Sequence, residues 1–117
     1  MSDWIKMREY EQDGFRLVVS RHYEDTNPRD HFDCFDTEEQ KEEFFSKIES
    51  GFYDWFGFRV QAYKHGILLG QDSLWGCCYE NPEEIFTDGT CADVAWQAIK
   101  EAKNTIQRII EGEGVTA

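Results

Sequence analysis

The dipeptide Asp13-Gly14 is the feature that most limits the folds open to this chain. It stands between two runs rich in strand-forming residues, 4–12 and 15–24. Asp-Gly between such runs is typical of a two-residue β-hairpin, because both residues tolerate the backbone conformation that this turn requires. The N-terminal segment is therefore predicted to form two antiparallel strands.

A second pair of strands is predicted around the dipeptide His65-Gly66. Apolar and polar side chains alternate over residues 55–64, which is the pattern of a strand with one buried face. The run 67–80 follows the turn and carries Gly70 and Gly76 in its interior. Glycine inside a strand indicates a bulge or a break.

Capping residues and apolar stripes predict two helices. Asp36 or Thr37 can supply the N-cap of a helix that runs through residue 50, and Gly51 ends it. A second helix is expected between a Thr90-x-x-Asp93 cap and Gly112. Its predicted apolar stripe consists of Ala95, Trp96, Ile99, Ala102, Ile106 and Ile109 or Ile110. We expect a single domain, residues 1–117, with an α+β fold in which an antiparallel sheet of four to five strands packs against two helices.

Composition indicates a folded protein that stays in the cytoplasm. Hydrophobic residues make up 40% of the chain, which is enough for a core. No apolar run approaches the ~20 residues of a membrane span, and the N-terminus lacks the pattern of a signal peptide. We expect the cysteines to stay reduced in that compartment, without a bound metal or cofactor. They are Cys34, Cys77, Cys78 and Cys91.

Negative charge is concentrated in one segment. The formal net charge is −12, and residues 24–54 hold eleven acidic residues against Arg29, Lys41 and Lys47, which is about two thirds of that charge. Free nucleic acid and acidic membranes are therefore poor partners, and a basic surface is the natural complement. Within the segment, Glu38 and Glu42 stand four residues apart, as do Glu39 and Glu43, so each pair is a like-charge neighbour on a helix.

The stretch "DHFDCFD" contains residue types that bind metals or act as nucleophiles. A zinc or manganese site with Asp and His ligands is one interpretation. A thiol enzyme centred on Cys34, His31 and Asp33 is another. An acidic, solvated loop that leads into a helix cap is the interpretation we favour, because no His-x-x-x-His pair, phosphate loop or nucleophile motif is present.

Aromatic residues gather in "FYDWFGF", and Trp75 follows later in the chain. Such a cluster is typical of a core strand and its approach. It is also typical of a protein–protein hot spot, where Trp and Tyr are the usual anchors. Tyr53, Trp55 and Trp75 are the candidate anchors in that case.

Three short motifs, "NPRDHFD", "AYKHG" and "DSLWGCCYENPEEI", are similar in order to those of small acidic proteins encoded by bacteriophages and plasmids. In that group a Pro-Arg-acid-aromatic-Asp stretch precedes a Tyr-x-x-His-Gly-like turn and an Asp-Ser segment. The resemblance supplies no catalytic residues. It implies a phage or mobile-element origin, and with size and acidity it looks like the anti-CRISPR and antirestriction inhibitors of host defence.

The sequence thus predicts a non-enzymatic inhibitor that imitates nucleic acid at a basic groove of a host nuclease or CRISPR complex. A small metal- or thiol-dependent enzyme is one alternative. A regulatory protein that binds one partner through an aromatic patch is another, with acidity serving only solubility. The candidate partner-binding residues are Asp30, Asp33, Asp36, Glu38, Glu39, Glu42, Glu43, Glu49, Tyr53, Asp54, Trp55 and Trp75.

Overall fold

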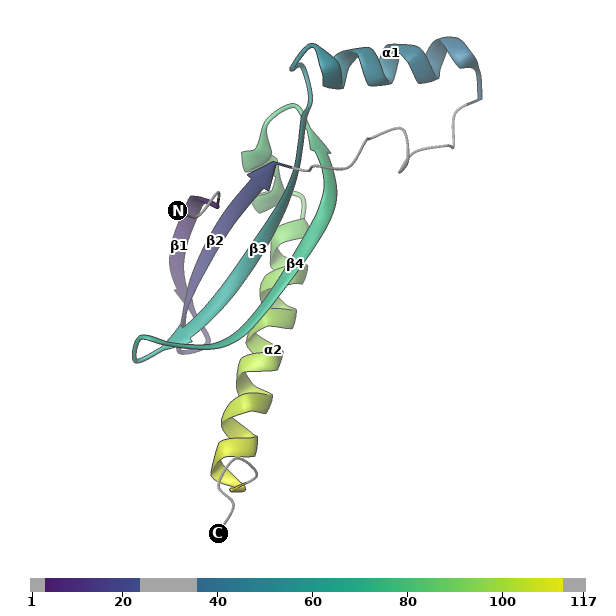
Figure 1. Cartoon of the computed structure of the whole chain (residues 1–117). Helices are drawn as coiled ribbons and strands as arrows, with labels where there is room; N and C mark the ends of the chain where they lie inside the picture. The colour runs from purple at the N-terminus through teal and green to yellow at the C-terminus, as the bar shows by residue number, and fades with distance from the viewer. Residues whose placement is uncertain (1–3, 24–35, 113–117) are drawn as a thin grey trace.

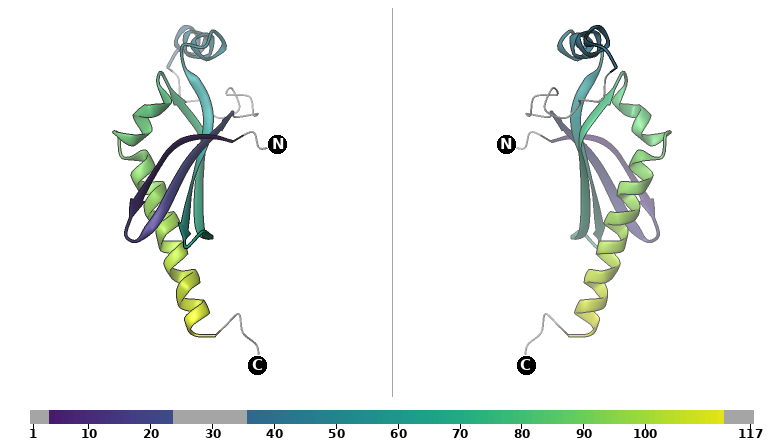
Figure 2. Two further views of the ribbon diagram at one scale, coloured as in Figure 1. Left: turned by 90° about the vertical axis from the view of Figure 1, so that its left-hand side faces the viewer. Right: turned by 90° about the vertical axis from the view of Figure 1, so that its right-hand side faces the viewer.

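A computed structural model describes residues 4–23 and 36–112, and it has the α+β fold that the sequence predicts. Its antiparallel sheet has four strands in the order β1-β2-β3-β4, with α2 against one face and α1 beyond one end (Figure 1). Figure 2 shows the sheet edge-on, with no described helix on its other face. The elements are β1 (Ile5–Gln12), β2 (Phe15–Tyr23), α1 (Glu38–Glu49), β3 (Asp54–Lys64), β4 (Ile67–Tyr79), the short 3₁₀ helix η2 (Pro82–Phe86) and α2 (Thr90–Ile110).

Both predicted hairpins are confirmed. Asp13 and Gly14 have φ values of 54° and 83°, and His65 and Gly66 have φ values of 53° and 77°. Positive φ at both central residues defines the type I′ turn, whose twist matches that of the flanking strands. The two turns set β1 against β2 and β3 against β4 as antiparallel neighbours.

The glycines of β4 have two different roles. Gly76 has a φ of 76° and lies where the β3–β4 register shifts between Phe56 and Phe58, so the predicted bulge is confirmed there. Gly70 pairs with Ala62 at a second register shift, between Ala62 and Tyr63, so the predicted irregularity is confirmed there too, and Gly70 also marks a close approach of the helix. A Cβ at this position would lie 2.3 Å from the carbonyl oxygen of Ala98 and 2.4 Å from the amide nitrogen of Ala102.

The core lies between the sheet and α2. Alternate side chains of β2 and β3 point toward the helix, as the period of two in a strand requires. The buried helix face contributes small residues, which allows the close approach to Gly70. The core residues include Phe15, Leu17, Val19, Phe56, Phe58, Val60, Ala62, Ile85, Cys91, Val94, Ala95, Ala98, Ile99 and Ala102.

The predicted stripe of α2 is correct in its middle and wrong at three positions. Ala95, Ile99 and Ala102 are buried, and Ile106 packs against the core. Trp96 is 56% exposed, because it lies about 130° around the helix from the centre of the buried face. The side chains of Ile109 and Ile110 are exposed because α2 runs past the end of the sheet (Figure 1).

One of the two predicted helix caps is confirmed and the other is wrong. Thr37 caps α1, where its Oγ1 accepts a hydrogen bond of 3.1 Å from the amide of Gln40. Thr90, by contrast, is the first helical residue of α2 and not its cap. Its amide donates to Oδ1 of Asp88 over 2.9 Å, and the hydroxyl of Tyr79 donates to Oδ2 of Asp88 over 2.7 Å. Among the described residues, no helix is long and apolar enough to cross a membrane.

Candidate functional site

Helix α1 carries acidic side chains on one face. At about 100° per residue, Glu38, Glu42 and Glu49 fall within about 40° of one another, and Glu39 and Glu43 extend this face to about 140°. The side chains of all five residues are exposed, as is that of Asp36 just before the helix. Residues 36–49 hold six carboxylates and two lysines, so this short segment is strongly negative. We call these six residues the acidic face.

The apolar and aromatic side of α1 borders the acidic face, because Phe45 follows Glu42 by three residues and precedes Glu49 by four. Phe45 is 1% exposed, and its ring lies 5.4 Å from that of Phe44. The ring of Tyr53, just before β3, lies 5.8 Å from Phe44. Lys47 lies over the Tyr53 ring and is within 3.7 Å of Glu43. Tyr53 is therefore half-buried against the apolar side of α1.

The remaining predicted site residues are distributed over several places. Asp30 and Asp33 lie outside the described residues, as do His31 and Cys34 of the alternative enzyme site. Asp54 lines a cleft near the start of β3, away from the acidic face of α1. Trp55 is only 8% exposed, so little of its ring is available to a partner, whereas Trp75 is 46% exposed.

Trp75 belongs to a cluster that the sequence did not reveal. Its ring centroid lies 5.6 Å from that of Trp4 and 6.0 Å from that of His22, and the latter two are 5.3 Å apart. The guanidinium of Arg59 stacks 4.1 Å above Trp4. Nε of Arg59 is buried without a hydrogen-bond partner among the residues that the structure describes. These side chains meet on the face of the sheet opposite α2, and we call them the aromatic cluster.

Gly57 makes the aromatic cluster possible. A Cβ at this buried position would lie 2.1 Å from Cε3 of Trp75, so only glycine leaves room for the indole to lie against β3. The sequence does contain an indication of this close contact, because a glycine inside a strand of aromatic residues often marks a place where another group packs closely. It could not identify Trp75 as the neighbour, because that pairing depends on the bulge at Gly76.

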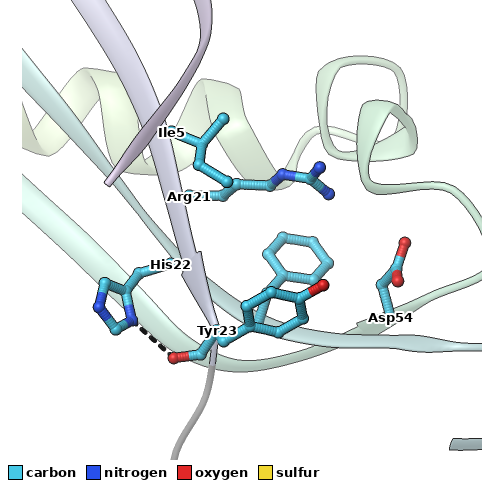
Figure 3. Close-up of a pocket in the computed structure, with 6 residues that line it drawn as sticks. Ile5, Arg21, His22, Tyr23 and Asp54 are labelled. Carbon is cyan, nitrogen blue, oxygen red and sulfur yellow. Dashed lines mark hydrogen bonds between the residues drawn. The ribbon is translucent and has the colours of Figure 1, made fainter. Parts of the chain in front are cut away.

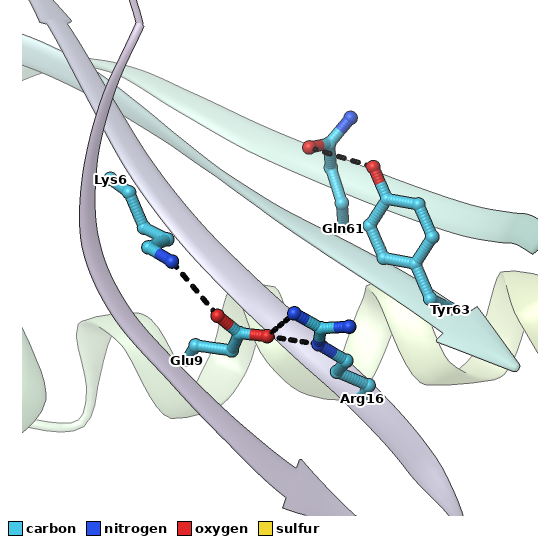
Figure 4. Close-up of polar contacts among 5 residues, drawn as sticks. All are labelled: Lys6, Glu9, Arg16, Gln61 and Tyr63. Atoms are coloured by element: carbon cyan, nitrogen blue, oxygen red, sulfur yellow. Dashed lines mark hydrogen bonds and ion pairs between the residues drawn. The ribbon is translucent and has the colours of Figure 1, made fainter. Parts of the chain in front are cut away.

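The rest of the same sheet face is polar (Figure 4). Glu9 accepts hydrogen bonds from Lys6 and Arg16, so two cations share one carboxylate and this group is not negative. The hydroxyl of Tyr63 donates to Gln61 over 3.4 Å. This face therefore differs in character from the acidic face of α1.

A cleft lies where the start of β1, the end of β2 and the start of β3 meet η2. Its inner recess has a volume of about 20 Å³ and is lined by residues that include Arg21, Tyr23 and Asp54 (Figure 3). An outer space of about 310 Å³ shares Arg21 and Asp54 with the recess and extends to Asn81 and Glu83. In the same region, Nδ1 of His22 donates to the carbonyl oxygen of Tyr23 over 2.7 Å.

The thiols of Cys78 and Cys91 are poorly suited to nucleophilic chemistry. Burial raises the pKa of the Cys78 thiol, and the nearby Asp54 carboxylate raises it further. Burial also raises the pKa of Cys91, although Tyr10 and Arg8 oppose this shift. Both therefore stay protonated near neutral pH, and the thiolate is the reactive form. In the part of the chain that the structure covers, no three His, Cys, Asp or Glu side chains are grouped as metal ligands.

Comparisons with known proteins identify no relative of this chain. No family model, curated protein or solved structure matches it.

Proposed function

We propose that this protein is a non-enzymatic binding protein that docks the acidic face of α1 into a basic groove built for nucleic acid. The groove would belong to a host defence nuclease or a CRISPR complex, which is the class of partner that the resemblance to phage and plasmid proteins suggests. The carboxylates of α1 would occupy the positions of backbone phosphates. The observation that carries the proposal is the acidic face itself, with its exposed carboxylates on one side of one helix.

The spacing of these carboxylates suits such imitation. Residues i and i+4 rise about 6 Å along a helix, which is close to two phosphate steps of ~3.4 Å on one strand. Glu38 with Glu42 and Glu39 with Glu43 have this separation. Their mutual repulsion costs only a few tenths of a kcal/mol per pair, and a cationic groove would more than offset that cost.

Some of the acidic residues near the sheet are paired with cations. Glu9 is paired with Lys6 and Arg16, and Glu83 lies 3.6 Å from Arg8. On α1, Lys47 lies 3.7 Å from Glu43, but residues 36–49 hold six carboxylates and only two lysines. A cationic partner would therefore be drawn to α1 in preference to the sheet.

The experiment is affinity capture with matched charge variants. One variant combines Glu38→Lys, Glu39→Lys and Glu43→Lys, and its control combines Glu80→Lys, Glu84→Lys and Glu101→Lys at exposed positions outside α1. Both raise the formal net charge from −12 to −6. We expect the α1 variant to lose binding to the captured partner by about a hundredfold, which is about 2.7 kcal/mol, and the control to lose far less.

Helix stability must be separated from binding in this comparison. Lysines in the first turn of α1 oppose the helix dipole and weaken the helix. A third variant with glutamine at positions 38, 39 and 43 removes the charge without this conflict, and circular dichroism reports helix content. Equal binding by the wild type and all three variants would exclude α1 as the docking surface.

The aromatic cluster supports a second candidate function, in which the protein regulates one partner through an apolar contact. Trp75 is 46% exposed beside Trp4, and exposed tryptophans are frequent anchors of interfaces. In this case Trp75→Ala would abolish binding, and affinity would be insensitive to salt. The first proposal predicts the opposite on both counts.

A further inference from the structure

The cleft between η2 and the strand ends has two spaces that share Arg21, Asp54 and Ile5 as lining residues. The outer space, about 310 Å³, lies at the lower end of the range of small-molecule sites. The inner recess, about 20 Å³, has room for one water molecule. A ligand that fits here is therefore small, of the size of a single amino acid.

Two opposite charges line this cleft without forming an ion pair. Arg21 and Asp54 are both half-buried, and no ion pair in the described part of the chain includes either of them. Figure 3 shows the guanidinium of Arg21, the hydroxyl of Tyr23 and the carboxylate of Asp54 around a common space. Half-buried charges normally gain a partner, because desolvation without one is costly.

The other charged groups near the cleft are already engaged. Lys6 lies 2.9 Å from Glu9, and Glu83 lies 3.6 Å from Arg8. Arg8 in turn stacks 3.8 Å above the ring of Phe86, which holds η2 against the sheet. Arg21 and Asp54 thus remain as the charges that a ligand would meet.

The chemistry of the lining selects the class of ligand. A guanidinium binds a carboxylate through two parallel hydrogen bonds, and a carboxylate binds an ammonium group. A ligand with both groups satisfies Arg21 and Asp54 together. Because it has no net charge, it is also not repelled by a protein of formal net charge −12. Ile5, Met7 and Pro82 supply apolar surface for an attached side chain.

We propose that this cleft binds a free α-amino acid, with its carboxylate on Arg21, its ammonium group on Asp54 and its side chain against Ile5, Met7 and Pro82. The site is separate from the acidic face of α1, so it does not depend on the proposed docking function. Tyr23 offers a hydroxyl donor to the same carboxylate. Its side chain lines the 20 Å³ recess beside the larger space, and its ring is 73% exposed.

Calorimetric titration of the full-length protein tests the proposal. The probes are glycine, L-leucine and L-phenylalanine, together with acetate and ethylammonium, which each carry one of the two charges. We expect at least one amino acid to bind, and neither single-charge probe to bind as tightly. Arg21→Gln and Asp54→Asn should each weaken that binding by at least about tenfold, whereas Arg16→Gln, which removes a cation from the other face of the sheet, should leave it unchanged.

Three results would overturn the proposal. The first is the absence of heat with all amino acids up to about 10 mM. The second is acetate binding equal to that of the amino acids, which would indicate a simple anion site. The third is amino acid binding that persists in both cleft variants. If a cleft variant fails to fold, the titrations of the wild-type protein with amino acids, acetate and ethylammonium still test the proposal.

Discussion

The close contact between Gly70 and α2 allows a quantitative prediction for Gly70→Ala. The new Cβ would lie 2.3 Å from the carbonyl oxygen of Ala98 and 2.4 Å from the amide nitrogen of Ala102. Both atoms belong to the helix backbone, so no side chain can rotate away. Restoring ordinary contact requires α2 to move outward by about 1 Å, which opens a close-packed core.

The expected loss of stability follows from two opposing terms. Overpacking of this kind costs about 3 kcal/mol, and replacing glycine by alanine in a strand regains about 0.5–1 kcal/mol of backbone entropy. The net loss is therefore about 2–2.5 kcal/mol, or a fall in Tm of about 10 °C for a domain of this size. Urea titration followed by circular dichroism measures it, and the m-value should not change.

Ser73→Ala is the control for this experiment, because Ser73 is exposed on the same strand. Its stability should stay within about 0.5 kcal/mol of the wild type. A Gly70→Ala variant as stable as Ser73→Ala would show that α2 does not lie this close to β4, and the account of the core would be wrong.

Three further predictions test the caps and the aromatic cluster. Thr37→Ala removes the hydrogen bond to the Gln40 amide and should destabilise α1 by about 1 kcal/mol, measured by hydrogen exchange of the α1 amides. The hydrogen bonds that Asp88 accepts from the Tyr79 hydroxyl and the Thr90 amide lower the pKa of its carboxyl group below the ordinary value of 3.8. The ionised carboxylate therefore stabilises the folded protein fully above pH 3.8, and this contribution is lost as the pH falls through the lowered pKa. Asp88→Asn should therefore lower Tm at pH 7, with the difference from the wild type shrinking at about pH 3, and an equal difference at both pH values would contradict this. Gly57→Ala should displace the Trp75 indole, shifting its resonance in ¹⁹F spectra of fluorotryptophan-labelled protein while that of Trp96 stays in place.

The local structure of this protein could be predicted from sequence because its signals are local. Asp13-Gly14 and His65-Gly66 specify turn conformations through their own backbone preferences. Thr37 caps the helix that directly follows it. The α+β class then follows from two hairpins and two helices without any knowledge of long-range contacts.

The errors and omissions arise where distant segments decide the outcome. The apolar pattern of α2 continues to Ile109 and Ile110, but the side chains are buried only as far as the strands extend along the helix. The N-cap of α2 is Gly89 and not Thr90, and the Thr90 amide donates to Asp88, whose carboxylate also accepts from Tyr79 on β4. Arg21 and Asp54 are far apart in sequence, and pairing of β2 with β3 brings them to one cleft.

We have proposed that the acidic face of α1 takes the place of nucleic acid on a cationic partner. The most direct test measures whether the protein displaces duplex DNA from the captured partner, over a range of salt concentrations. We expect one-for-one displacement, and an affinity whose logarithm falls steeply and linearly with the logarithm of salt concentration. A ternary complex in which the partner holds DNA and this protein together, at an affinity independent of salt, would contradict it.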